Sequence, residues 1–297
     1  GGGFRRGAVD LIGARAKCGK STLADNVALS IASRGTPVLI LDTEMSQEDH
    51  WNRLLANISG VAINDISSSK FNREKQLVDD VEEAAEKVKE IPYHYISVAG
   101  KSFDEILGIA RRWLFKHVGY NDEGRMNDCL IIYDYLKLMT SESINNNVAE
   151  FQALGFQITQ LHNFCVEHDV PCLAFVQLNR DGITRESEDV ISGSDRLIWL
   201  CTSFSIFKAR SPEEIAEENL GNGVNRRLIP VVARHGPGMD GNSIFMRMTG
   251  ELAKLEEIGT KRDAERIHRE QQDGFPDKEE TDQEVSDSSG GEIDEGS

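Results

Sequence analysis

The chain has 297 residues, 39% of them hydrophobic and 28% charged, so it can bury the core of one large domain. No apolar run approaches the roughly 18 residues of a membrane-spanning helix, which excludes a helical membrane protein. The net charge of −17 does not exclude nucleic acid, because residues 273–297 hold ten acidic residues and one lysine and leave −8 for the remainder.

The cysteines form an odd set without a C-x-x-C pair, and most lie in apolar surroundings. We therefore expect buried thiols in a reducing compartment such as the cytoplasm, in place of a disulfide framework or a zinc site. No secretion signal is visible, and the start at Gly1 without a methionine leads us to expect a piece of a longer protein. The five cysteines are Cys18, Cys129, Cys165, Cys172 and Cys201.

Short apolar runs alternate with helical patterns over the first 179 residues. Strands are predicted at residues 8–14, 36–45, 93–100, 128–139 and 171–179. Helices are predicted at residues 21–35, 46–60, 70–90, 102–119 and 147–168. This alternation favours a parallel sheet with helices on both faces, and near-continuous apolar strands are typical of a sheet that is covered on both sides.

The pattern changes in the last third of the chain. Residues 180–195 are polar without a clear period, which predicts a mobile loop. Residues 226–236 and 241–250 are joined by Gly and Pro and predict an antiparallel hairpin at the edge of the sheet. We place one α/β domain at residues 1–260 and an acidic, disordered tail at residues 261–297.

The stretch LIGARAKCGKST, residues 11–22, joins a predicted strand to a predicted helix. Small residues there let backbone N–H groups surround phosphates, a lysine reaches the β- and γ-phosphate oxygens, and a hydroxyl binds Mg²⁺. The motif predicts a site for ATP and Mg²⁺, although Ala14 stands where the first glycine is usual. The predicted phosphate-binding residues are Ala14, Arg15, Ala16, Lys17, Cys18, Gly19, the catalytic Lys20, the metal ligand Ser21, and Thr22. Cys18 is expected to be only a small residue that the loop tolerates, although positive charge there could lower the pKa of its thiol.

Two further strand ends carry carboxylates. LIIYDYL places Asp134 at the end of an apolar strand, where it would hold the Mg²⁺ shell. LILDTEMS places Asp42 and Glu44 at the end of another strand, where one of them could deprotonate the attacking water. Since side chains alternate along a strand, both are expected to point the same way, and periodicity does not choose between them.

In this order, the motifs resemble those of the bacterial and phage replicative helicases of the DnaB type, over roughly residues 1–250. GGGFRRGAVDLIGARAKCGKST is similar to that family's phosphate loop and its approach, in which Ala followed by Arg replaces the first glycine. The resemblance implies a RecA-like P-loop NTPase fold, with a mostly parallel sheet flanked by helices and an antiparallel edge hairpin. YDYLKLM resembles the family's Walker-B strand, with Lys137 where Gln is common.

Three residue roles follow from the same resemblance. DTEMS resembles the family's E-M-S segment, which implies that Glu44 is the catalytic base. VQLNR is similar to its third motif, which implies that Gln177 senses the γ-phosphate. ARHGP is similar to its R-N-G-P hairpin, which implies that Arg234 reaches the ATP of a neighbouring subunit. Val232 departs from the lysine expected beside that arginine, and SGSDRLIWL is a degenerate form of a later signature.

The resemblance implies an ATP-dependent replicative helicase that moves 5′ to 3′ on single-stranded DNA as a ring of six, in the cytoplasm of a bacterial or phage-infected cell. We expect Lys137, Arg180 and Arg185 to bind DNA phosphates. A primase is an expected partner, and the acidic tail is expected to dock on a DNA polymerase. The divergent segment 60–125 and the tail are typical of a phage-type relative.

Two alternative functions remain open at this point. A RecA-like recombinase shares the fold but would form open filaments that pair homologous strands. A regulatory or loader ATPase that does not translocate would hydrolyse ATP without a response to single-stranded DNA.

Overall fold

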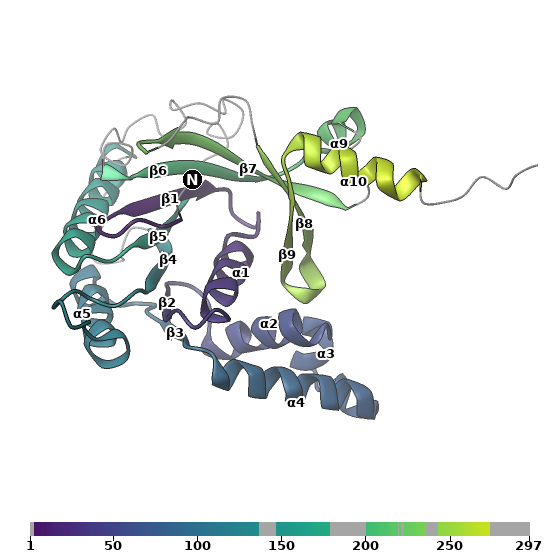
Figure 1. Ribbon diagram of the computed structural model, residues 1–297, viewed down its shortest axis with the longest axis horizontal. Coiled ribbons are helices and arrows are strands. Elements are labelled where there is room, and N and C mark those ends of the chain that lie inside the picture. Colours follow the sequence, from purple (N-terminus) through teal and green to yellow (C-terminus); the bar gives the residue numbers. More distant parts are fainter. Residues whose placement is uncertain are drawn as a thin grey trace, which may run out of the picture.

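The computed structural model describes residues 3–136, 147–178, 200–218, 220, 223–235 and 243–273. In these residues a single mixed sheet has the strand order β3-β2-β4-β5-β1-β6-β7-β8-β9 (Figure 1). The strands are β1 (Val9–Ala14), β2 (Val38–Asp42), β3 (Tyr93–Ser97), β4 (Leu130–Leu136), β5 (Cys172–Gln177), β6 (Ser203–Ala209), β7 (Val224–Ala233), β8 (Ile244–Thr249) and β9 (Lys254–Gly259).

The described helices flank the parallel part of this sheet or extend from its edges. The α-helices are α1 (Lys20–Ala32), α2 (Gln47–Ser59), α3 (Ile63–Ser67), α4 (Lys75–Glu90), α5 (Phe103–Trp113), α6 (Asn147–His168), α9 (Pro212–Glu218) and α10 (Lys261–Asp273). Shorter helical turns are η1 (Lys70–Arg73), η2 (Leu114–Val118) and η4 (Gly250–Leu252). No helix in the described ranges is both long enough and apolar enough to cross a membrane.

Strands β3, β2, β4, β5 and β1 are mutually parallel, as the alternation of strands and helices predicted, and β6 adds a sixth parallel strand. Figure 1 shows α1 on one side of this parallel part and α5 and α6 on the other. Side chains therefore alternate between two cores: Ile40 packs with the α1 side, whereas Leu39 and Leu41 pack with the α5 and α6 side. Strand β2 is buried along its whole length, because helices cover both faces.

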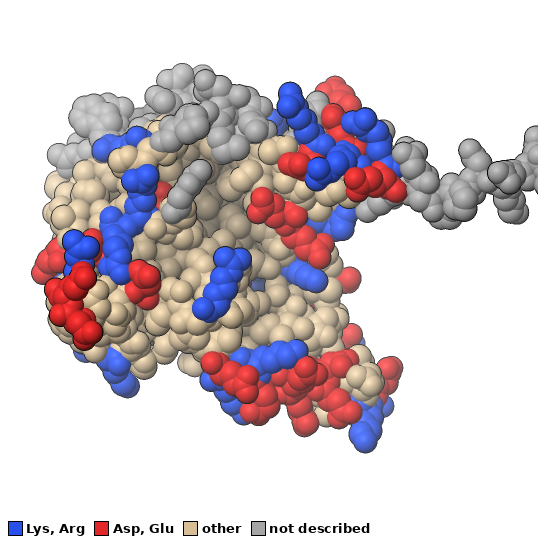
Figure 2. Space-filling view, viewed as in Figure 1, with Lys and Arg blue, Asp and Glu red and all other residues tan. Residues whose placement is uncertain are grey.

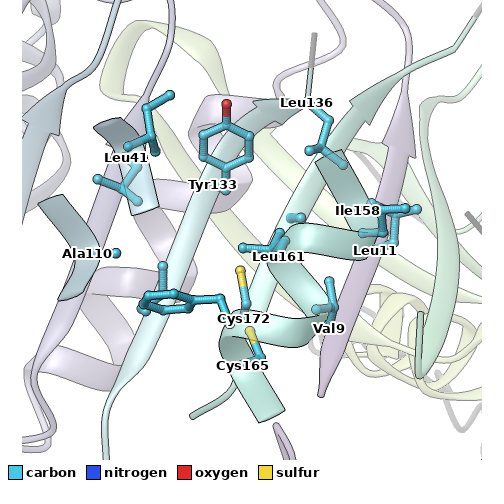
Figure 3. Packing of buried hydrophobic residues seen from close by; sticks show 14 of the residues in the cluster. Val9, Leu11, Leu41, Ala110, Tyr133, Leu136, Ile158, Leu161, Cys165 and Cys172 are labelled. Atoms are coloured by element: carbon cyan, nitrogen blue, oxygen red, sulfur yellow. The ribbon is translucent and has the colours of Figure 1, made fainter. Parts of the chain in front are cut away.

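The core under α5 and α6 is shown in Figure 3, where Cys165 of α6 lies next to Cys172 of β5. All five cysteines are buried, and none forms a disulfide. Burial raises the pKa of the Cys129 and Cys201 thiols to about 12. These thiols are therefore protonated at neutral pH and act as small apolar side chains.

The antiparallel part of the sheet is larger than the hairpin predicted from the sequence. Strands β7 and β8 form the expected antiparallel pair, and β9 adds a further antiparallel strand at the edge. The sequence analysis did not predict β9, β6 or α9. The turn between β8 and β9 reaches back to α1 and α2, where Asn26 and Asn57 donate hydrogen bonds to the Ala253 carbonyl, at 2.9 and 2.8 Å.

Residues 261–273 were expected to be disordered, but the structure shows an ordered helix there. They form helix α10, whose Ala264 packs with Leu220, Val224 and Phe245 in a small apolar cluster. The first part of the predicted tail thus belongs to the folded domain, because one apolar face suffices to anchor an otherwise charged helix. Residues 274–297 and the loop predicted at residues 180–195 lie outside the described ranges.

Helices α2, α3 and α4 pack together beside the sheet around Ala56, Val61, Ile66 and Val81. Figure 2 shows acidic and basic side chains mixed over this part of the surface. On α4, ion pairs form within the helix, for example Lys87–Glu83 at 2.7 Å. Pairs this exposed contribute little to stability.

Candidate nucleotide site

The loop between β1 and α1 has the backbone geometry of a phosphate cradle. Lys17 and Gly19 have positive φ angles of 62° and 104°, and the Cys18 N–H donates to the Arg15 carbonyl at 3.3 Å. A Cβ on Gly19 would lie 2.7 Å from the Met248 Sδ atom. Glycine is therefore required at this position by the left-handed backbone and by the close approach of β8.

The antiparallel strands brace this loop. The Arg226 Nε atom of β7 donates to the Cys18 carbonyl at 2.9 Å, and the Cys18 thiol donates to the Phe207 carbonyl of β6 at 3.4 Å. Burial raises the pKa of Cys18, although the Arg226 charge opposes that rise. The thiol faces the strands behind the loop, as suits a small residue packed there, and the alternative of a lowered pKa is wrong.

Ser21 and Asp134 meet at the start of α1. The Ser21 hydroxyl donates to Asp134 Oδ2 at 2.5 Å, and Asp134 is 3% exposed. Burial, together with the neighbouring Asp42, raises the pKa of Asp134 to about 6, against the hydrogen bond from Ser21. The buried Asp134 Oδ1 atom has no hydrogen-bond partner in the described residues. Hydroxyl and carboxylate oxygens are hard ligands, so this pair fits a hydrated Mg²⁺ ion.

Asp42 and Glu44 have different surroundings. Asp42 ends β2 and is 3% exposed, and its Oδ1 atom accepts the N–H groups of Glu44 and Met45 at 2.7 and 2.8 Å. Glu44 is exposed and its Oε1 atom accepts the Tyr135 hydroxyl at 2.9 Å. The strand alternation behind the expectation that both carboxylates point the same way stops at Asp42, where β2 ends, although both residues line one cavity.

These side chains enclose a cavity of about 190 Å³ at the carboxyl ends of β2 and β4. Asp42 lies directly beside Asp134 in the register of the two strands. Lys20, the first residue of α1, is 8% exposed, and its ammonium lies 4.7 Å from the centre of the Tyr135 ring. The cavity is lined by Ser21, Asp42, Glu44, Met45, Asp134 and Tyr135.

Gln177 ends β5, the strand that lies between β1 and β4. It is exposed and pairs in register with Ala14, the last residue before the phosphate loop. The strand order therefore places an amide side chain between the loop and the strand that carries Asp134. This position is compatible with contact to a terminal phosphate.

Arg234 lies at the opposite end of the sheet. It follows β7, and its N–H donates to the carbonyl of Thr202, the residue before β6, at 3.0 Å. Phe207, which contacts the phosphate loop, is five residues further along β6. At about 3.3 Å per residue the two positions are roughly 17 Å apart. Exposed Arg234 therefore does not reach the nucleotide site of its own chain.

A cationic cavity of about 530 Å³ surrounds Arg234. Arg5 and Arg6, which precede β1, line it together with His162 and His235. Arg6 is engaged by Asp128, at 2.6 Å, and by the Met126 carbonyl, at 2.8 Å. Lys137, Arg180 and Arg185, the predicted DNA-binding residues, lie outside the described residues.

A buried polar cluster supports α1 from behind. The Arg53 Nη2 atom of α2 donates to the Thr22 hydroxyl at 2.6 Å, and its Nε atom lies 3.8 Å from Asp25 Oδ2. His50 Nδ1 lies 3.5 Å from Asp25 Oδ1, and the Tyr93 hydroxyl is 3.1 Å from His50 Nε2. Burial raises the pKa of Asp25 to about 8 and lowers that of His50 to about 3. The sequence analysis did not predict this cluster, because no local motif indicates it.

The fold and the phosphate loop define a RecA-like P-loop NTPase domain, and solved structures share this fold. A DnaB-like replicative helicase, described with its interactions with primase, has a TM-score of 0.71 at 18% identity, over 85% of this chain and 58% of that one. A second solved structure, described as an ATPase domain, has a TM-score of 0.70 at 17% identity, over 85% of each chain.

Sequence comparison identifies the family. The model of the DnaB-like helicase C terminal domain matches residues 1–192, so the chain belongs to this family. The replicative DNA helicase DnaB of Helicobacter pylori (strain ATCC 700392 / 26695) is 25% identical over 186 residues, which cover 63% of this chain and 36% of the relative. The replicative DNA helicase DnaB of Treponema pallidum (strain Nichols) is 26% identical over 182 residues, which cover 60% of this chain and 38% of the relative. The chain matches little more than a third of these relatives' length.

Proposed function

We propose that the chain is the motor domain of an ATP-driven replicative DNA helicase. The observation that carries this proposal is the meeting of Lys20, Ser21, Asp134 and Glu44 at one end of the sheet, in a chain of the DnaB-like family. The same residues support hydrolysis of ATP, since a metal-binding pair and a carboxylate face one cavity, and a cationic side chain lies against the ring of Tyr135, which lines that cavity.

In this proposal each residue has one task. The loop N–H groups and Lys20 hold the β- and γ-phosphates, and Ser21 and Asp134 hold a Mg²⁺ ion, which neutralises phosphate charge when bound. Glu44 takes a proton from a water molecule, whose oxygen then bonds to the γ-phosphorus. The bond from that phosphorus to the bridging oxygen breaks, and ADP and phosphate leave. Gln177 contacts the γ-phosphate and transmits its loss.

Arg234 is proposed to act on the ATP of a neighbouring copy, as in a ring of six. The 17 Å separation within one chain supports this assignment, since a guanidinium stabilises the transition state only at contact distance. Arg5 lines the same cavity, and we propose that it supplies the second cation that Val232 does not. Single-stranded DNA would pass through the ring beside Lys137, which follows β4 in the sequence, and Arg180 and Arg185, which follow β5.

The experiment that tests this function is unwinding of a duplex with one single-stranded tail. We expect ATP-dependent unwinding of the substrate with a 5′ tail and not of the one with a 3′ tail. Lys20→Ala is the control and should unwind neither. Strand pairing by filaments would identify a recombinase, and ATP hydrolysis that ignores single-stranded DNA would identify a regulatory ATPase. Either result would contradict the helicase.

The trans role of Arg234 has its own test. Arg234→Ala should lower ATP turnover by about 100-fold or more, because one charge-stabilising donor is lost from each site. Mixed with the wild-type chain, it should depress activity out of proportion to its fraction, since each defective boundary also affects its neighbours. A linear dependence on the mutant fraction, or an active pure mutant, would contradict the assignment.

A further inference from the structure

Tyr135 contacts both proposed catalytic side chains of the cavity. It follows Asp134 in β4, its hydroxyl donates to Glu44 Oε1 at 2.9 Å, and its ring centre lies 4.7 Å from the Lys20 ammonium. Its backbone N–H donates to the Thr43 hydroxyl at 3.4 Å. Tyr135 therefore links the strand of the metal ligand to the segment of the proposed base, and the mechanism above leaves its hydroxyl without a task.

The backbone around Glu44 is already fixed by other groups. The Asp42 carboxylate accepts the N–H groups of Glu44 and Met45. The Met45 carbonyl in turn accepts the Tyr95 hydroxyl at 3.0 Å and the Ser97 hydroxyl at 3.1 Å. This arrangement holds the main chain but leaves the three side-chain torsions of Glu44 undetermined.

The Glu44 side chain itself is exposed. In the described part of the chain, the Tyr135 hydroxyl is the group that donates a hydrogen bond to its carboxylate. A general base must lie within hydrogen-bond reach of the water that it deprotonates, and a displacement of about 1 Å can cost a factor of 100 in rate. An exposed glutamate with free torsions would spend little time in such a position.

We propose that Tyr135 is a positioning residue for the general base. By occupying Oε1, its hydroxyl fixes the plane of the Glu44 carboxylate and leaves Oε2 to accept the proton of the attacking water. Tyr135 does not touch the reacting atoms and acts through Glu44. The inference rests on the proposed role of Glu44, and its test must separate the two.

Tyr135→Phe removes the hydroxyl and keeps the ring beside Lys20 and the backbone contact to Thr43. We expect kcat for ATP to fall about tenfold and KM for ATP to change less than about twofold. The loss in kcat is a part of the roughly 10²- to 10⁴-fold rate enhancement that a general base contributes. The matched control is Tyr133→Phe on the same strand. The Tyr133 hydroxyl is buried without a hydrogen-bond partner in the described residues, so its loss should leave kcat unchanged.

A double-mutant cycle with Glu44→Gln separates the two proposals. If Tyr135 acts through Glu44, adding Tyr135→Phe to Glu44→Gln should lower kcat no further. Two outcomes would overturn the role of Tyr135 alone. Either Tyr135→Phe lowers kcat tenfold both in the wild-type protein and in Glu44→Gln, or Tyr135→Phe keeps the wild-type kcat while Glu44→Gln loses most of its activity. Near wild-type activity of Glu44→Gln would instead overturn the base assignment.

Discussion

The carboxyl ends of the parallel strands gather Asp42, Glu44 and Asp134 around a small cavity with Lys20 at its side, whereas the amino ends gather arginines around a larger one. The first end has acidic groups that suit a metal ion and a water molecule. The second has Arg234 in a cationic cavity, away from the phosphate loop between β1 and α1. In our proposal, one sheet thus carries two unlike halves of a hydrolytic site.

The difference between the two ends teaches why a single copy is expected to be a poor ATPase. The neighbourhood of Arg234 and the phosphate loop lie at opposite ends of β6, roughly 17 Å apart. Because β6 is paired within the sheet, it does not bend to bring them together. In our account the halves complete one another only where the amino end of one copy meets the carboxyl end of the next. Such head-to-tail contacts close into rings when their rotation allows it.

The largest effect is expected at the carboxyl end from Lys20→Ala. Turnover of ATP should fall by about 10³-fold or more, because a preorganised cation on the phosphates is lost from a dehydrated site. The free energy of unfolding should change little, since the ammonium faces the Tyr135 ring at the cavity and not the apolar core. Steady-state hydrolysis and thermal unfolding check both statements. Residual turnover above a tenth of the wild-type rate would contradict the role of Lys20.

The two carboxylates of the same end should respond differently to amide substitution. Glu44→Gln should bind ATP yet hydrolyse it about 100-fold more slowly, because the proton acceptor is lost. Asp42→Asn should lose less than about fivefold, since an amide oxygen can still accept the Glu44 and Met45 N–H groups. Nucleotide binding and single-turnover hydrolysis measure both. If Asp42→Asn lost most of its hydrolysis while Glu44→Gln stayed near the wild-type rate, Asp42 and not Glu44 would be the general base.

A smaller effect is expected from Asp25 in the polar cluster behind α1. Its folded-state pKa is raised from 3.8 to about 8, so the folded protein holds this proton more tightly than the unfolded chain. The resulting stability is present at low pH and is lost as the pH rises through about 8. From pH 7 to 9 the wild-type protein should lose about 1 kcal/mol more unfolding free energy than Asp25→Asn.

Denaturant unfolding at the two pH values measures this difference. The window avoids His50, whose pKa is lowered to about 3, and Asp134, at about 6. The charged Arg53 favours the ionised form of Asp25 and limits the size of the effect. Parallel pH profiles for the wild-type protein and Asp25→Asn would show that Asp25 keeps an ordinary pKa in the folded state.

The smallest effect on turnover is expected from deletion of residues 274–297, which follow α10 in the sequence. ATP hydrolysis should stay within about twofold of wild type, because this acidic segment offers few apolar side chains to a core. We expect it to bind a cognate DNA polymerase in a salt-sensitive manner, as exposed charges are screened within about 10 Å at 0.1 M salt. Equal polymerase binding by the full and shortened chains would leave only a solubilising role.

The parts of the site that are contiguous in sequence were predictable. An apolar strand, Gly19-Lys20-Ser21 and a helix follow one another directly, so local pattern sufficed to locate the phosphate loop. The parallel core was predictable for a similar reason, since alternating strands and helices restrict the sheet to few topologies. The resemblance to one family then assigned roles to Glu44, Gln177 and Arg234, which remain predictions.

The contacts that depend on strand order were not predictable. Arg226 reaches Cys18 across 208 residues, because β6 and β7 follow β1 in the sheet. Arg53 reaches Thr22, and Tyr135 reaches Glu44, because α2 and β4 fold back beside α1 and β2. Periodicity reports which face of an element is apolar but not which element will cover it. Such partners therefore carry no signal in a single sequence.

The most direct measurement mixes two inactive variants, Lys20→Ala and Arg234→Ala, and follows ATP hydrolysis. Each variant spoils a different half of the boundary, so in equal mixture about a quarter of the boundaries join an intact Lys20 to a neighbour's intact Arg234. We predict that the mixture recovers turnover that neither variant has alone, at less than a quarter of the wild-type rate, because each intact boundary lies between two defective ones. A mixture as inactive as its components, after verified subunit exchange, would contradict the claim that the two ends of the sheet complete one another between copies.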